Sequence, residues 1–266
     1  MHSENINLYY IAHSPETLAS MPPGYAVLDN MAHQRDDWRE YWPIRNFLIN
    51  SNLDDNAWYG FFSPRFRDKT GLLPEQVKHI IHTHEESTEV FTFSPQPDMG
   101  AFFLNVFEQE NTFTPGFLST CELFFKSIGM STDLNTMVMD SRHVVFSNYI
   151  VAKPKFWSAW LSLNEKLFTL CENGENDLQR LLTQETRYPG QVQLKVFLME
   201  RIASFMLARE KWCTHAYNTF NCAWSASRLN QFQDSAIISD ALKIAIREQG
   251  HPEYMQQFSR IRDSLR

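Results

Sequence analysis

The chain of 266 residues has few cysteines, few glycines and no long apolar run. No stretch approaches the ~18 apolar residues of a membrane-spanning helix, and the start of the chain, Met1 to Asn7, is polar. We therefore predict neither a membrane span nor a secretory signal. The four cysteines are scattered and form no Cys-x-x-Cys pair, which favours free thiols over a structural zinc site. Free thiols indicate a reducing compartment, so we expect a cytoplasmic protein.

Several functional motifs are also missing. The sequence contains no Gly-x-Gly-x-x-Gly and no Gly-x-x-x-x-Gly-Lys-Ser/Thr, which argues against dehydrogenases and kinases. It has no Gly-x-Ser-x-Gly elbow, which argues against an ordinary α/β-hydrolase. The formal net charge of −7 disfavours broad binding of nucleic acid, so no DNA partner is expected. A local basic pocket for a small anion remains compatible with this charge.

The pattern of apolar residues along the chain predicts an α/β fold. Short apolar runs favour strands at 6–12, 25–28, 58–62, 89–93 and 144–151, and helical spacing of apolar residues favours helices around 37–50, 74–84, 115–128, 157–168, 194–205 and 238–245. The length suits one core. We predict a single domain over 1–266, with a sheet-rich half at 1–155 and a mainly helical half at 156–266. Aromatic residues make up 14% of the chain and can fill a core or line a sugar-binding cleft.

Three stretches, in their order along the chain, resemble a known family. Residues 58–71 run from Trp-Tyr-Gly to Lys-Thr-Gly, residues 146–153 form an Asn-containing segment, and residues 199–204 contain Glu-Arg. They resemble bacterial glycosyltransferase-like proteins associated with capsule and lipopolysaccharide genes. The resemblance implies a GT-A-like, Rossmann-like mixed sheet flanked by helices. It also implies transfer of a sugar from a nucleotide sugar to a glycan or other hydroxyl acceptor, with peripheral association with a polysaccharide assembly machinery.

The predicted donor site lies at strand ends, where ligands usually bind in open α/β sheets. Arg65 and Lys69, with Arg67 between them, follow the strand at 58–62 and could hold a diphosphate by charge-assisted hydrogen bonds. The alternative is a solvated basic loop. The full set predicted to bind the nucleotide sugar is His13, Asp29, Arg65, Lys69, Asn148 and Arg201.

The predicted catalytic group consists of acids and one imidazole. Sugar transfer to a hydroxyl needs a group that removes the acceptor proton, and Asp140, His143 or Glu200 could supply it. Asp98 could hold a ribose hydroxyl, a metal ion or that proton, although it could equally brace a turn. For Glu200 and its neighbour Arg201, a solvated helix face is the alternative.

The resemblance departs from the family at the metal site. Many GT-A enzymes use an Asp-x-Asp pair to bind Mn²⁺ or Mg²⁺, and no such pair occurs here. Gln96-Pro97-Asp98 stands where the pair is expected, so metal dependence is in question and Arg or Lys could act instead. His79, His82 and His84 do not complete a metal motif. The alternative function is a non-catalytic carbohydrate-binding or scaffold protein that keeps the fold without the Asp pair.

Overall fold

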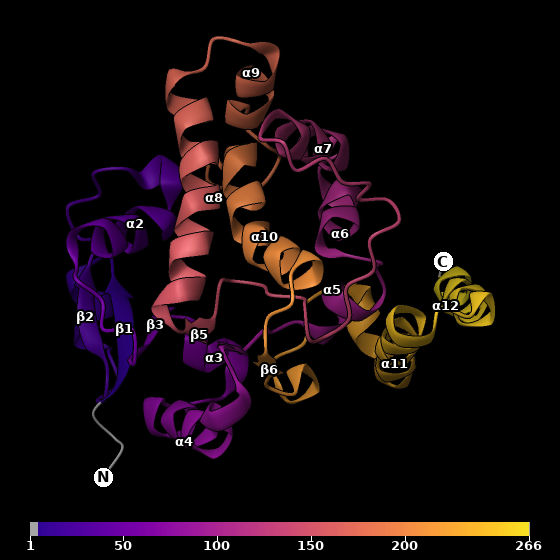
Figure 1. The fold of residues 1–266 in the computed structure, drawn as a ribbon, viewed down its shortest axis with the longest axis horizontal. Helices are drawn as coiled ribbons and strands as arrows, with labels where there is room; N and C mark the ends of the chain where they lie inside the picture. The colour runs from indigo at the N-terminus through magenta and orange to yellow at the C-terminus, as the bar shows by residue number, and fades with distance from the viewer. Residues whose placement is uncertain (1–4, 266) are drawn as a thin grey trace.

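The computed structural model describes residues 5–265, so part of the polar start of the chain lies outside the described residues. Within this range six strands form one mixed sheet in the order β2-β1-β3-β5-β4-β6 (Figure 1). All pair in parallel except β5, which is antiparallel to both neighbours. The α/β class is thereby confirmed. The strands are β1 (Ile6–Ala12), β2 (Ala26–Asp29), β3 (Trp58–Phe62), β4 (Val90–Thr92), β5 (Ile150–Ala152) and β6 (Thr214–Ala216).

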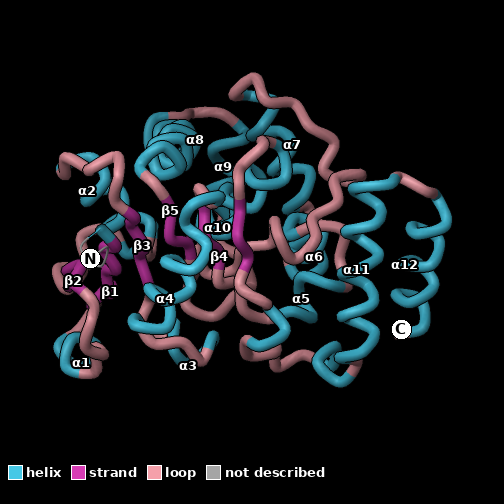
Figure 2. Tube along the Cα trace, turned by 60° about the horizontal axis from the view of Figure 1, so that its bottom comes forward, coloured by secondary structure: helices cyan, strands magenta, loops and turns pink. Residues whose placement is uncertain are grey.

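Helices cover the sheet, and further helices lie beyond one end of it (Figures 1 and 2). The last two, α11 and α12, form a hairpin that packs on α5 at the side of the molecule far from β2. The helices are α1 (Pro15–Ala19), α2 (Tyr41–Asn50), α3 (Phe66–Thr70), α4 (Pro74–His84), α5 (Pro97–Ala101), α6 (Val106–Phe113), α7 (Phe117–Ser127), α8 (Pro154–Asn173), α9 (Asp177–Thr183), α10 (Leu194–Arg209), α11 (Gln233–Gln249) and α12 (Pro252–Ser264).

Strand β3 is buried on both faces because successive side chains point to opposite sides of a sheet. Tyr59 and Phe61 enter the larger core, which contains residues of α2, α8 and α10. Trp58 and Phe62 enter a smaller core with residues of α3 and α4. At Gly60 between them, a Cβ would lie 2.7 Å from the Val151 side chain, so the close approach of β5 requires glycine here.

The strand prediction differs from the structure in two places. The predicted strand 144–151 begins only at Ile150, because Ser147 and Asn148 have φ of 64° and 51°, a left-handed conformation that a strand cannot contain. The predicted helical half, 156–266, also contributes the edge strand β6, which pairs with β4. Three residues are too few to show alternation, so periodicity could not reveal β6. Helices α3, α5, α6, α9 and α12 were not predicted.

The parallel strands bring several loops to one edge of the sheet. The carboxyl ends of β1, β2, β3, β4 and β6 lie there, and the antiparallel β5 begins there. The loop before β5 is tied to α10 because the Val145 N–H donates to the Ser204 hydroxyl at 2.8 Å. It is tied to the segment after β4 because the Phe146 N–H donates to the Ser94 hydroxyl at 3.0 Å. This edge is therefore shared by the sheet and α10.

Two further sequence predictions can be compared with the structure. In the part of the chain that the structure describes, no helix combines the length and apolar character needed to cross a bilayer. The four cysteines, Cys121, Cys171, Cys213 and Cys222, are free thiols.

Candidate functional site

Two acids and two cations meet at the carboxyl edge of the sheet. Glu40 directly precedes α2, and Glu200 lies in the middle of α10. Arg65 directly precedes α3, and Lys69 lies in its last turn. Glu40 interacts electrostatically with Glu200 and with Lys69, and Lys69 also interacts with Arg65 and Glu200. We call these four residues the strand-end cluster.

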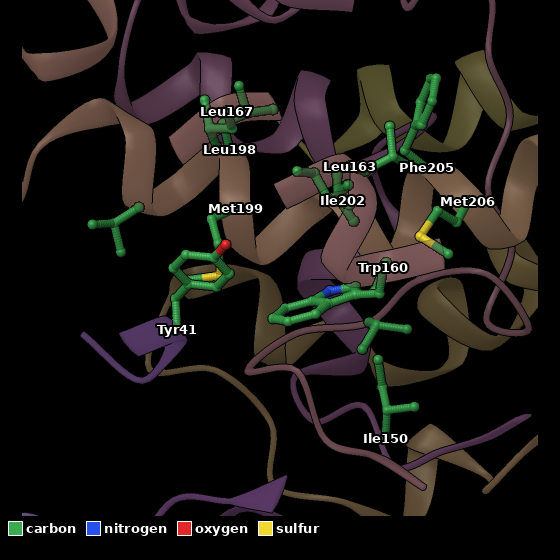
Figure 3. Packing of buried hydrophobic residues seen from close by; sticks show 14 of the residues in the cluster. Tyr41, Ile150, Trp160, Leu163, Leu167, Leu198, Met199, Ile202, Phe205 and Met206 are labelled. Carbon is green, nitrogen blue, oxygen red and sulfur yellow. The ribbon is translucent and has the colours of Figure 1, made fainter. Parts of the chain in front are cut away.

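The packed core brings the two acids together. Tyr41 of α2 and Met199 of α10 belong to the larger core, which also contains Trp160 of α8 (Figure 3). The rings of Tyr41 and Trp160 lie 5.7 Å apart between centroids. Glu40 precedes Tyr41 and Glu200 follows Met199 in the sequence. The rigid packing of Tyr41 and Met199 therefore fixes the backbone positions from which the two glutamate side chains extend.

The electrostatics of the cluster disfavour its charged forms. Burial, with the neighbouring Glu200 carboxylate, raises the pKa of Glu40 to about 7, although Lys69 and the Ser63 hydroxyl oppose this shift. Burial also raises the pKa of Glu200, against the opposing effect of Arg201 and Lys69. The pKa of Lys69 is lowered by burial and by repulsion from Arg65. The Glu200 side chain is nevertheless 39% exposed, so its carboxyl can be reached from solvent.

Lys69 is held in place by the loop before β5. Its ammonium donates to the Ser147 hydroxyl at 2.8 Å and lies 5.7 Å from the centre of the Tyr149 ring. The Tyr149 hydroxyl in turn lies 2.8 Å from the hydroxyl of Ser63, the first residue after β3. A fixed ammonium at a strand end is suited to binding an anion such as a phosphate.

The same loop carries backbone strain and an unsatisfied polar group. Ser147 and Asn148 both adopt left-handed φ, which asparagine tolerates better than most residues but which is unfavourable for serine. The Asn148 side chain is buried, at 6% exposure, and its Oδ1 has no hydrogen-bond partner in the described structure. Its Nδ2 has only the Met199 sulfur, at 3.6 Å. Strain and unpaired buried polar atoms of this kind concentrate at functional sites.

Four of the ten predicted site residues therefore lie at this site: Arg65, Lys69, Asn148 and Glu200. His13 follows β1 and Asp29 is the last residue of β2, at the same edge of the sheet, and both are exposed. The Asp29 carboxylate accepts a hydrogen bond from the Met31 N–H at 2.8 Å, so part of its hydrogen-bonding capacity is used in a local turn.

Asp98 is placed differently, because its side chain is fully buried. It accepts a hydrogen bond from the Ser225 N–H at 3.0 Å and further ones from the hydroxyls of Ser225 and Ser227. These hydrogen bonds hold the segment that follows β6 against α5. This is the structural role that the sequence left open, and it leaves no free oxygen facing solvent.

Asp140 and His143 belong to an ionic network beside α11, in which the Asp140 carboxylate is buried. The Asp140 carboxylate lies 2.9 Å from Arg142, 3.1 Å from His143 and 3.7 Å from Arg247. Burial disfavours its charged form, but hydrogen bonds from His143 and Arg142 outweigh burial and hold the Asp140 pKa well below its ordinary value. A carboxylate so stabilised is a poor base.

Arg201 is likewise occupied inside the fold. Its guanidinium lies 2.6 Å from the Glu110 carboxylate and donates to the Val106 carbonyl at 2.9 Å. The alternative of a solvated face, given for Glu200 and Arg201 together, is wrong for Arg201 because this side chain is buried between α10 and α6.

Within residues 5–265, no three His, Cys, Asp or Glu side chains are arranged to hold a metal ion. The histidines of α4 do not converge: His84 stacks on His215 of β6 with ring centres 3.9 Å apart, and His82 lies 3.9 Å from Glu85.

Sequence reasoning missed Glu40. It stands between two charged or polar neighbours at a helix start, where an acid is normally explained by the helix dipole. Its proximity to Glu200, 160 positions later in the numbering, depends on how α2 and α10 pack.

A comparison of the chain with protein-family models gives no match, and a comparison with curated proteins gives none either.

Proposed function

We propose that this protein is a GT-A-like glycosyltransferase that transfers a sugar from a nucleotide-sugar donor to a glycan or other hydroxyl acceptor in surface polysaccharide synthesis. The observation that carries the proposal is the meeting of Glu40, Arg65, Lys69 and Glu200 at the carboxyl edge of the sheet. A mixed sheet with a polar carboxyl edge is the expected place for a nucleotide ligand.

The two cations suit the leaving group. As the bond between the sugar and the diphosphate breaks, its electron pair leaves with the phosphate oxygen, and negative charge grows there. Arg65 and Lys69 would stabilise that charge by charge-assisted hydrogen bonds. Because Lys69 is already held by Ser147 at 2.8 Å, little reorganisation is needed when the charge develops.

The two acids suit different parts of the same step. Two neighbouring carboxylates repel each other when both are ionised, so the pair tends to keep one proton. One member of the pair is then an acid and the other is a base. Glu200 is exposed enough to meet an acceptor, so we assign it as the base. The acceptor oxygen forms the new bond to the sugar, and its proton passes to the Glu200 carboxylate. Glu40 holds the other proton of the pair.

A screen of nucleotide sugars tests the proposal. A donor that binds the folded protein raises its melting temperature, with and without added Mn²⁺. We expect stabilisation by at least one donor class, abolished in Lys69→Met and Arg65→Ala. Arg67→Ala is the matched control, because Arg67 lies on α3 between these residues but is exposed and outside the cluster. Binding that is equal in all four proteins would overturn the assignment of the donor site.

The second candidate is carbohydrate binding without catalysis. The observation that favours it is the lack of an Asp-x-Asp pair in the sequence. A titration calorimetry experiment separates the two, since a binding module takes up a glycan without any nucleotide. Saturable glycan binding with no donor binding and no donor consumption would favour this second candidate.

A further inference from the structure

We infer that the strand-end cluster binds the diphosphate of its donor together with about one proton, which Glu40 takes up. This inference rests on the proposed function, because the anion is the diphosphate of the nucleotide sugar. It adds a property of the site: affinity for the donor rises as the solution becomes more acidic near neutral pH.

The charge balance of the cluster is the first argument. With both acids ionised, the charges of Glu40 and Glu200 cancel those of Arg65 and Lys69. A diphosphate diester carries two negative charges, so it would enter a site with no net attraction for it. Protonation of one carboxylate leaves a net positive site and removes the repulsion between that acid and the phosphate oxygens.

The surroundings decide which acid takes up the proton. The groups that face Glu40 are Lys69 and Ser63 from the β3–α3 side and Glu200 from α10. Tyr149 of the loop before β5 also interacts with Glu40. Burial and the like charge of Glu200 favour its neutral form, and Lys69 is the cation of this group that favours its charged form.

Glu200 has more support as an anion. It faces Arg201, at 4.0 Å, in addition to Lys69. Part of the Arg201 charge is neutralised by Glu110 at 2.6 Å, but Glu200 still keeps two cationic neighbours, whereas Glu40 has one. Arg39, next to Glu40 in the sequence, directs its guanidinium to the Gly190 carbonyl at 2.8 Å. The proton therefore belongs on Glu40.

Asn148 gives independent evidence that a ligand belongs at this site. Its Oδ1 is buried and unpartnered, and swapping the two amide atoms would leave the nitrogen unpartnered instead. The residue before it, Ser147, holds Lys69. A ligand that combines an anion for Lys69 with a hydroxyl or N–H donor for Asn148 would satisfy both groups, and a nucleotide sugar carries both.

The inference predicts a specific pH dependence. Glu40 has a pKa of about 7 without ligand, and a bound diphosphate raises that pKa further by repulsion. Below this pKa Glu40 is already protonated and the dissociation constant is flat. Above it, binding must draw a proton from solution, so the dissociation constant rises by up to about tenfold per pH unit until the pKa of the bound state is reached.

Calorimetry of the full chain with UDP-glucose and GDP-mannose tests this, because their diphosphate diesters do not titrate near neutrality. Titrations in buffers of different ionisation enthalpy give the number of protons taken up. We expect close to one proton at about pH 8 and close to none at about pH 6. Glu40→Gln should bind without proton uptake and about tenfold more tightly than the unmodified protein at about pH 8.

The control is Glu75→Gln, which removes the same charge from an exposed position on α4 outside the cluster and should behave like the unmodified protein. Donor binding or transfer without proton uptake would overturn the inference and leave the proposed function standing. Uptake that persists in Glu40→Gln would overturn the assignment to Glu40. Failure of both donors to bind at any pH would count against the inference, and failure of the whole donor screen would overturn the proposed function as well.

Discussion

The strand-end cluster and the network around Asp140 contain the same kinds of side chain in opposite arrangements. In the network, one buried carboxylate has Arg142, His143 and Arg247 around it, and its pKa is held well below the ordinary value. In the cluster, burial together with the neighbouring Glu200 carboxylate raises the pKa of Glu40 to about 7. The first arrangement stabilises the fold. The second costs stability, and such sites are retained where function requires them.

Neutralising Glu200 tests the functional side of this comparison and should have the largest effect. If Glu200 removes the acceptor proton, Glu200→Gln should lower donor consumption in the presence of a glycan acceptor panel by about 10²–10⁴-fold. Donor affinity at acidic pH should change much less, because the cations remain. The readout is release of nucleoside diphosphate, with Glu75→Gln as the control for loss of one negative charge. Unchanged turnover in Glu200→Gln would remove it from the catalytic role.

The network should respond in the opposite sense. Asp140→Asn leaves Arg142 and His143 without their buried partner and should destabilise the protein by about 3 kcal/mol in urea unfolding. The depressed pKa of Asp140 also sets a pH dependence. Its contribution is fully present above the ordinary Asp value of 3.8 and is lost as the pH falls through the lower folded-state pKa. Arg67→Ala, at an exposed position, should change stability by less than about 0.5 kcal/mol.

An effect of the opposite sign sharpens the contrast, because Glu40→Gln should stabilise the protein. The ordinary pKa of 4.5 is raised to about 7 in the fold, so ionising Glu40 costs folding free energy as the pH rises between these values. The contribution of Glu40 to the folding stability of the unmodified protein is therefore least favourable above about pH 7. Glu40→Gln should gain up to about 3 kcal/mol at about pH 8 and almost nothing at about pH 4. A loss of stability at the higher pH would show that Glu40 is a structural residue.

The smallest expected effect concerns the strained loop. Asn148→Gly removes a left-handed φ penalty and an unsatisfied buried amide, but it also removes packing against Met199. We expect a net change in unfolding free energy within about 1 kcal/mol, together with weaker donor binding in the thermal-shift screen. Unchanged donor binding would separate the loop from the site.

Local sequence patterns could predict the sheet edge but not the electrostatics of the site. Arg65 and Lys69 follow β3, whose five buried residues form a clear apolar run, so their place at a strand end was predictable. Asn148 was predicted from a strand that does not exist at that position, because left-handed φ at Ser147 and Asn148 has no glycine to signal it. Asp98 and Asp140 look like surface acids in the sequence, and only the tertiary structure supplies Ser225, His143 and Arg247 as their partners.

Glu40 marks the limit of such reasoning. Its raised pKa comes from burial and from Glu200, and both depend on the packing of α2 against α8 and of α8 against α10. No spacing rule connects residues so far apart in the chain. Pairs of like charges are therefore visible only once the helices are placed on the sheet.

Carboxyl ¹³C NMR of Glu40, followed from acidic to alkaline pH in the unmodified protein and in Glu200→Gln, tests the central claim most directly. The account predicts a pKa near 7 that moves down toward the ordinary value of 4.5 once Glu200 is neutral. A Glu40 that titrates at its ordinary value in both proteins would contradict it.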